Sequence, residues 1–210
     1  MVVKTTERTR WRESRRRSAR EAIIQGAWTL VREEGLAALS IRELASRVGI
    51  TTPTVYAYFE SKNAIYDAMF GQAAIEFRDA MAAPHNVEDQ KELLLADVHR
   101  FFAFSLSDTA RYQLLFQRTL PGFEPSPESY APAQQALAGA RRRLADIGIT
   151  ASRHLDLFTA LVTGLVDQQV ANDPGGKRWS QLAKEAVDMF VTHCQAAKVS
   201  KSRLLIHPAQ

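Results

Sequence analysis

Side chains that can bind a polyanion are concentrated between Ser40 and Lys62. This segment, SIRELASRVGITTPTVYAYFESK, places hydroxyl, aromatic and basic residues on two short helix-like stretches that a glycine joins. Hydroxyl and ammonium groups donate hydrogen bonds to phosphate oxygens, and a guanidinium can pair with the edge of a guanine. Two short helices joined by a tight turn are typical of a unit that places its second helix in the major groove of DNA. The segment therefore predicts nucleic-acid recognition.

Signals in the same region indicate where its helices begin and end. Ser40 with Glu43 three residues later forms a capping box, and Gly49 ends the helix that follows. Thr51 can cap the next helix, with Pro53 tolerated in its first turn. The residues expected to face the core of this unit are Ile23, Ala27, Leu30, Val31, Ile41, Leu44, Ala45, Val48, Val55 and Phe59.

The composition predicts an all-α protein. The chain has 210 residues, is 46% hydrophobic and shows no alternating strand-like runs. Further helices are expected at residues 18–34, from Ser61 onward, and at about 87–106, 108–117, 130–147, 152–171 and 179–197, about nine in all. The longest uncharged apolar run, residues 157–166, is shorter than the ~18 residues that span a bilayer. We therefore expect a cytoplasmic protein without a membrane partner.

The basic charge lies at the N-terminus. Residues 1–20 contain eight Lys and Arg, namely Lys4, Arg8, Arg10, Arg12, Arg15, Arg16, Arg17 and Arg20. Two Glu leave this segment at +6, although the whole chain carries only +4. Such a segment is expected to be a flexible, solvated arm. A basic arm before a helix-turn-helix unit can also neutralise phosphates or enter a minor groove, and the two interpretations are compatible.

A family resemblance follows from three stretches of sequence. These are VREEGLAALSIRELASRVGI, TTPTVYAYF and SKNAIYDAMF, all within residues 23–70. In the spacing of their glycines, caps, tyrosines and Ser-Lys pair they resemble the tetracycline-repressor (TetR) family of bacterial transcriptional regulators. The resemblance implies a basic flexible arm at residues 1–20, a helix-turn-helix domain at 21–64 and a helical ligand-sensing and dimerisation domain at 65–210.

The resemblance also implies which residues contact the operator, a double-stranded and palindromic DNA site. They are Ser40, Arg42, Thr51, Thr52, Pro53, Thr54, Tyr56, Tyr58 and Lys62. Arg42 stands where the family often reaches a base edge, and Lys62 with the Ser61 amide looks like a phosphate clamp at a helix N-terminus. Pro53 stands where other members carry a basic or glycine residue, so few direct base hydrogen bonds are expected there. Two alternatives remain open: Arg42 could be an exposed residue that pairs with Glu43 or another surface carboxylate, and Tyr56 could be partly buried against the first helix.

The larger domain is expected to dimerise and to bind a small molecule. The residues expected at the interface of a homodimer are Leu155, Phe158, Val162, Leu165, Val166, Leu182, Met189 and Phe190. The alternative is that these apolar stripes pack only within one chain.

Aromatic residues in the central helices suggest where a ligand binds. Phe101, Phe104, Tyr112, Phe116 and Phe123 could line a pocket with polar groups such as His99, Gln113 and Arg118, and residues 119–129 could form its rim. Each aromatic residue could equally be plain core. The unidentified effector would then be a small apolar or aromatic compound.

Catalysis has little support in this sequence. It has no Gly-rich phosphate loop, no GxSxG and no HExxH, so we expect no enzyme activity, no cofactor and no metal. The competing hypothesis is a constitutive DNA-binding or architectural dimer whose larger domain binds no ligand. A sealed helical core would favour that hypothesis, and a pocket among the central helices would favour a sensor.

Overall fold

The computed structural model describes the backbone of residues 3–206 and the side chains of residues 9–196. Within this range the regular structure is entirely helical, which confirms the predicted all-α class. Two short 3-10 helices accompany the α-helices: η1 (Leu36–Ala38) and η2 (Ser180–Leu182). The α-helices are α1 (Val3–Glu34), α2 (Ile41–Val48), α3 (Thr52–Tyr58), α4 (Lys62–Ala82), α5 (Gln90–Ser107), α6 (Thr109–Phe116), α7 (Pro127–Asp146), α8 (Ser152–Asn172) and α9 (Ala183–Ile206).

The chain folds into two compact units that do not follow the sequence in order. The first unit combines Met1–Ile75 with Asp108–Ala131, and the second combines Glu76–Ser107 with Pro132–Gln210. α4 and α7 each contribute residues to both units. The functional domain limits near residues 20 and 64 stay a prediction, because a packing unit need not coincide with a functional one.

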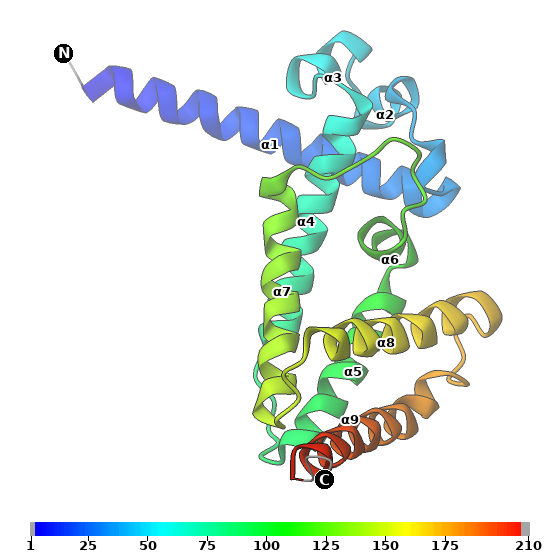
Figure 1. The fold of residues 1–210 in the computed structure, drawn as a ribbon. Helices are drawn as coiled ribbons and strands as arrows, with labels where there is room; N and C mark the ends of the chain where they lie inside the picture. The colour runs from blue at the N-terminus through cyan, green and yellow to red at the C-terminus, as the bar shows by residue number, and fades with distance from the viewer. Residues whose placement is uncertain (1–2, 207–210) are drawn as a thin grey trace. The chain divides into compact units, whose positions relative to one another are not determined.

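The core of the first unit joins α1, α2 and α3, which Figure 1 shows together. Eight of the ten predicted core residues are buried, namely Ile23, Ala27, Leu30, Val31, Leu44, Ala45, Val55 and Phe59. The other two, Ile41 and Val48 of α2, are partly exposed. Gly26 allows α1 and α2 to approach closely, since a Cβ atom there would lie 2.6 Å from Val48 Cγ2. The indole Nε1 of Trp28 donates to Gln72 Oε1 at 3.0 Å and so ties α1 to α4.

The predicted limits of α2 and the predicted start of α3 are confirmed by hydrogen bonds and dihedral angles. Ser40 Oγ accepts from the amide of Glu43 at 3.5 Å, and Thr51 Oγ1 accepts from the amide of Thr54 at 3.3 Å. Gly49 adopts φ 75°, a left-handed conformation that an L side chain rarely takes, and so ends α2. These local signals set the length and direction of α3.

α1 begins much earlier than predicted. The sequence predicts its start near residue 18 after a flexible arm, whereas the helix runs unbroken from Val3 to Glu34. The segment before residue 18 contains no Gly or Pro, and its arginines have good helix propensity. Because the buried half of α1 already supplies the costly nucleus, adding turns at its N-terminus costs little. The side chains of Lys4 and Arg8 lie outside the described residues.

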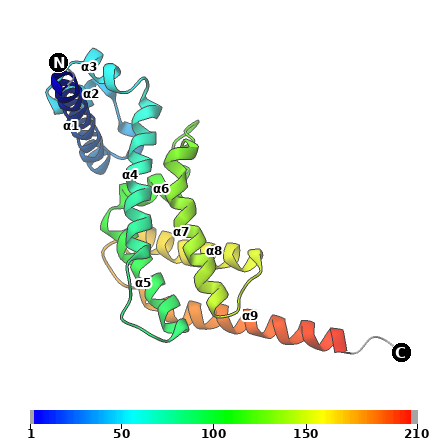
Figure 2. The ribbon, with the colours of Figure 1, turned by 90° about the vertical axis from the view of Figure 1, so that its left-hand side faces the viewer.

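The core of the second unit is formed by α5, α8 and α9, which pack against one another, as Figure 2 shows for α8 and α9. The rings of Phe158 and Phe190 lie 5.1 Å apart between those two helices. His85 Nε2 and Arg143 Nε both lie within 2.8 Å of the Asp97 carboxylate, which links α5 to α7.

Candidate DNA-binding site and ligand pocket

α3 presents to solvent the side chains that the sequence singles out. Val55 faces the core, while Pro53 and Tyr56 are exposed and Thr54 and Tyr58 are partly exposed. Ser40, Arg42 and Thr51 are exposed as well, and Thr52 and Lys62 are partly exposed. The nine residues thus lie on accessible parts of α2, α3 and the start of α4.

The structure describes the surroundings of Arg42 and Tyr56, for which alternative roles are open. Within the described residues, Arg42 forms no ion pair with Glu43 or with another carboxylate. The basic residue of α2 that does pair is Arg47, which bonds Glu33 of α1 at 2.5 Å, and this contact raises the pKa of the Arg47 guanidinium. Tyr56 is 51% exposed, so about half of this residue is accessible to solvent and to DNA.

The start of α4 holds a cation beside capped amides. Ser61 Oγ accepts from the amide of Ala64 at 3.1 Å and so caps the helix. Lys62 Nζ lies 3.5 Å from the carbonyl oxygen of Ala37 and 5.5 Å from the centre of the Tyr66 ring. These two contacts hold the ammonium at the N-terminal end of α4, where helix amides and positive charge together suit a phosphate.

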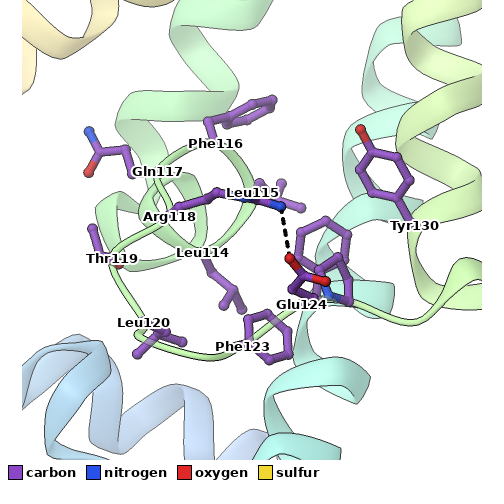
Figure 3. A pocket seen from close by; sticks show the side chains of 12 residues that line it. Leu114, Leu115, Phe116, Gln117, Arg118, Thr119, Leu120, Phe123, Glu124 and Tyr130 are labelled. Atoms are coloured by element: carbon purple, nitrogen blue, oxygen red, sulfur yellow. Dashed lines mark hydrogen bonds and ion pairs between the residues drawn. The ribbon is translucent and has the colours of Figure 1, made fainter.

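A cavity of about 500 Å³ lies in the same unit, between α4, α6 and α7. Figure 3 shows the side chains that line it. They come from Phe70, residues 114–120, residues 123–125 and Tyr130. The ring of Phe70 lies 6.5 Å from that of Phe123 and 6.1 Å from that of Tyr130. Arg118 Nη2 and Glu124 Oε1, both well exposed, form a 3.4 Å ion pair at this site.

The loop on one side of the cavity is tied to α4 by a single carboxylate. Asp67 accepts hydrogen bonds from the amide of Ser126 at 2.6 Å, from Ser126 Oγ at 3.0 Å and from Ser129 Oγ at 2.9 Å. Ser126 Oγ in turn accepts from the amide of Ser129 at 3.2 Å and caps α7. This cap explains why α7 begins at Pro127 rather than at the predicted Tyr130, since proline suits a first helical turn.

Comparison with known proteins gives the family. Residues 23–69, from within α1 to α4, match the sequence profile of the bacterial regulatory proteins of the tetR family. This chain belongs to the TetR family. It is a DNA-binding transcription regulator, as its relatives are.

The resemblance to other TetR-family proteins extends beyond the helix-turn-helix unit. The chain is 25% identical over 183 residues to the class A tetracycline repressor from transposon 1721 of Escherichia coli, covering 80% of this chain and 79% of that one. A TetR family transcription regulator from Marinobacter aquaeolei VT8 shares its fold with a TM-score of 0.62 at 20% identity, over 86% of this chain and 97% of that one. A TetR variant from Acinetobacter baumannii AYE, solved in complex with minocycline, has a TM-score of 0.58 at 23% identity, over 83% and 95%.

The five predicted ligand-binding residues of this TetR-family regulator are divided between the two units. Phe116 and Phe123 line the cavity, and Tyr112 is buried beside it with its ring 5.3 Å from that of Phe116. Phe101 and Phe104 belong to the second unit, where both pack on Phe77. Of the suggested polar groups Arg118 lines the cavity, whereas His99 and Gln113 do not. Phe70, which also lines the cavity, was not among the predicted ligand-binding residues. It lies one turn after Tyr66 on the same face of α4.

The predicted dimerisation stripe mostly faces the core. Leu155, Phe158, Val162, Val166 and Phe190 are buried within the chain, Leu165 is partly exposed, and only Leu182 and Met189 are exposed. The reason is that α8 carries more than one apolar row, and the predicted row is the one that meets α5 and α9. Another row of the same helix is accessible, and it contains Leu157, Ala160, Leu161, Gly164 and Leu165.

Features of other protein classes are not found in the described part of this regulator. No group of three or more His, Cys, Asp or Glu there could hold a metal ion. None of its helices within residues 3–206 combines the length and the apolar character needed to cross a membrane.

Proposed function

We propose that the protein is a homodimeric repressor that a small apolar or aromatic ligand releases from a palindromic operator. The observation that carries this proposal is the aromatic-lined cavity of about 500 Å³ in the same unit as α2 and α3. The competing hypothesis, a constitutive DNA-binding dimer, predicts a sealed core instead. A cavity of this size is in the range of small-molecule sites.

α3 enters the major groove in this proposal, and α2 lies above it. Arg42 reads a guanine, while the methyl and methylene surface of Thr52, Pro53 and Thr54 lies against thymine methyl groups. Ser40, Thr51, Tyr56 and Tyr58 donate to phosphates and position the unit. Lys62 holds a further phosphate at the start of α4.

α4 connects the cavity with the DNA contact. Lys62 and Phe70 are eight residues apart, about 12 Å along a helix. Asp67 lies between them and holds Ser126 and Ser129 of the loop that borders the cavity. A ligand that displaces Phe123 or this loop therefore changes the position that α4 prefers, and repression ends through a shift in population.

The chemistry of the cavity supports an apolar or aromatic effector. Phe70, Phe116, Phe123 and Tyr130 offer ring faces, and Arg118 with Glu124 supplies the polar groups that can orient a ligand. The solved TetR variant from Acinetobacter baumannii, whose complex contains minocycline, has a compatible fold.

The accessible row on α8 supports pairing with a second copy of the chain. Leu157 is 46% exposed, and Ala160, Leu161, Gly164 and Leu165 continue the row at helical spacing. Small residues between leucines allow two helices to approach closely. We therefore assign the homodimer contact to this row together with Met189 of α9, in place of the buried stripe.

The assigned DNA contacts can be tested on an operator selected by the protein from a random DNA library. We expect Arg42→Ala to relax the sequence preference, because it removes a base contact. Lys62→Ala should weaken binding to all sequences alike and lower the slope of log affinity against log salt by about 1. Titrations at several salt concentrations measure both effects. Equal losses on selected and random DNA for both variants would contradict these roles.

The ligand proposal can be tested by a thermal-stability screen followed by operator titration. A compound that raises the Tm and weakens operator binding supports the sensor. Tyr130→Ala should reduce that rise, whereas Leu137→Ala, which truncates a similarly exposed side chain of α7 that does not line the cavity, should not. A compound that raises the Tm without changing DNA affinity would argue for the constitutive alternative.

A further inference from the structure

The N-terminal half of α1 forms one wall of a groove whose other wall is α3. The groove has a volume of about 640 Å³ and is lined by Arg12, Arg15 and Arg16 of α1 and by Pro53, Thr54, Ala57 and Tyr58 of α3. Figure 1 shows this half of α1 running on past α2 and α3. All of these residues belong to the first unit, so the groove lies within one compact body.

Arg20 fixes the angle at which α1 passes α3. Its guanidinium donates to the carbonyl oxygen of Tyr58, the last residue of α3, and lies 4.1 Å from the centre of the buried Phe59 ring. Arg16 and Arg12 precede Arg20 by one and two helical turns on the same face. The contacts of Arg20 with Tyr58 and Phe59 therefore hold the guanidinium groups of Arg12 and Arg16 at defined positions beside α3.

The groove is strongly positive and has no acidic residue among its lining residues. In the described part of the chain, Arg12 and Arg16 form no ion pair with a carboxylate, and Arg15 lies 4.7 Å from the ring of Trp11. Thr54 and Tyr58, which both carry a hydroxyl group, line the opposite wall. Clustered guanidinium groups in a concave site attract an anion and can donate several hydrogen bonds to it.

We propose that this groove binds a phosphodiester strand of the operator, with Arg12 and Arg16 donating to its phosphates. The inference rests on the proposed DNA-binding function and adds a second contact element to it. The N-terminal segment thus acts as a helix held at a fixed angle, rather than as a flexible arm that finds a groove for itself.

The occupant is nucleic acid because one wall of the groove is the DNA-reading helix itself. A membrane would require an apolar face, and Trp11 is the one large apolar side chain among residues 9–20 of α1. A strand that flanks the major groove holding α3 passes next to Thr54 and Tyr58, which is where the guanidinium groups lie.

The first experiment compares two double variants that remove the same charge from opposite faces of α1. Arg12→Ala with Arg16→Ala removes groove cations. Arg10→Ala with Arg17→Ala is the control, because these exposed residues project about 160° and 140° away from Arg12 around the helix.

The groove pair should weaken operator binding roughly tenfold or more and lower the salt slope by about 2. The control pair should change the slope by less than about 0.5. Equal effects of the two pairs would overturn the proposal, since they would show only a general charge effect.

The second experiment keeps every charge and breaks the helix. Residue 18 lies between the exposed arginines and the buried half of α1. Ser18→Pro removes a backbone hydrogen bond of the helix at that point. We expect it to weaken binding as much as the groove pair does, whereas Ser18→Ala should bind like the wild type. Thermal unfolding checks that the remaining fold is intact. Full affinity of Ser18→Pro would mean a flexible arm and would overturn the proposal.

Failure of this inference can be separated from failure of the proposed function. If Arg42→Ala still relaxes sequence preference while the groove pair leaves the salt slope unchanged, the inference alone is wrong. If the wild type selects no sequence from the library, the proposed function is wrong. If the groove pair loses binding only to anionic phospholipid vesicles, the occupant is a membrane surface and the inference is overturned.

Discussion

Tyr66 links three parts of the first unit through one side chain. Its phenol donates to the carbonyl oxygen of Leu36 in η1 at 2.5 Å. Its ring lies 5.5 Å from Lys62 Nζ and 5.7 Å from the ring of Phe123 in the cavity wall. The side chain is buried, so the hydrogen bond to Leu36 satisfies both polar groups where water cannot. A single residue thus contacts the 3-10 helix before α2, Lys62 at the start of α4 and a wall of the cavity.

Because Tyr66 is buried, the free energy of unfolding should depend on pH in the alkaline range. Burial raises the pKa of Tyr66 from 10.0 to about 12. Because the folded-state pKa lies above the unfolded one, this residue's contribution to stability is complete below pH ~10 and is lost as the pH rises from ~10 to ~12. Phenylalanine does not ionise, so the Tyr66→Phe variant does not lose this contribution. Its curve of stability against pH should be flatter over that range. Urea unfolding at several pH values from 7 to 12 measures the difference.

At pH 7 the free energy of unfolding of Tyr66→Phe should be about 1 kcal/mol lower than that of the wild type, because the hydrogen bond to Leu36 is lost. Tyr130→Phe, which removes a hydroxyl from an exposed side chain, controls for the loss of a phenol. Parallel curves for the wild type and Tyr66→Phe between pH 10 and 12 would contradict the role given to burial.

At the scale of elements, the closeness of α1 and α2 depends on Gly26. A Cβ atom there would lie 2.6 Å from Val48 Cγ2 and 3.1 Å from Leu44 Cδ1, and both atoms belong to α2. Since α2 carries Arg42 and leads into α3, a shift of α2 would move the whole proposed DNA-binding surface.

Gly26→Ala should therefore destabilise the protein by about 1–3 kcal/mol through overpacking and should weaken operator binding. Gly139→Ala in α7 is the matched control, because a Cβ atom there would meet nothing nearer than Arg142 Nη2 at 3.9 Å. That control should gain roughly 0.5–1 kcal/mol from helix propensity. Denaturant unfolding measures both. A Gly26→Ala variant as stable as the wild type would show that Val48 can move aside.

Elements whose ends are set by local chemistry could be predicted from the sequence. Ser40, Gly49 and Thr51 act within three or four residues of themselves, so α2 and α3 were placed correctly. The start of α1 could not be predicted in this way. The charge of its arginine-rich segment alone predicts a solvated, flexible chain. The segment is helical because it continues a helix whose later residues are buried.

The cavity and the dimer row depend on packing between distant segments, which periodicity does not specify. Phe116 and Phe123 line the cavity, whereas Phe101 packs on Phe77 in the second unit. On α8, Phe158 and Leu157 are neighbours in sequence, and both rows are apolar. Which row faces inward depends on where α5 and α9 lie.

At the scale of the whole molecule, a palindromic operator requires two copies of the chain. The accessible α8 row belongs to the second unit, whereas the proposed DNA-binding residues belong to the first. In the proposed dimer, pairing through one unit therefore sets the spacing of two copies of the other.

Leu157→Glu should raise the dissociation constant of the dimer at least about tenfold, because it places a charge in an apolar contact. Operator affinity should fall with it. Leu137→Glu introduces the same charge at a similarly exposed leucine of α7 and should leave the dimer intact. Sedimentation velocity over a concentration series measures the association. A wild-type chain that stays monomeric at all concentrations would rule out this assignment.

The long α1 has a consequence for proteolysis. Residues 9–18 are all exposed and include five arginines, each a cleavage site for trypsin. A protease must open a helix before it can cut, and an end that buries no side chain opens at little cost. We expect trypsin to cut first between Arg10 and Arg17 and to leave the core from Ile23 onward intact. Operator DNA should slow this cut, and equal rates with and without DNA would contradict a strand bound along the helix.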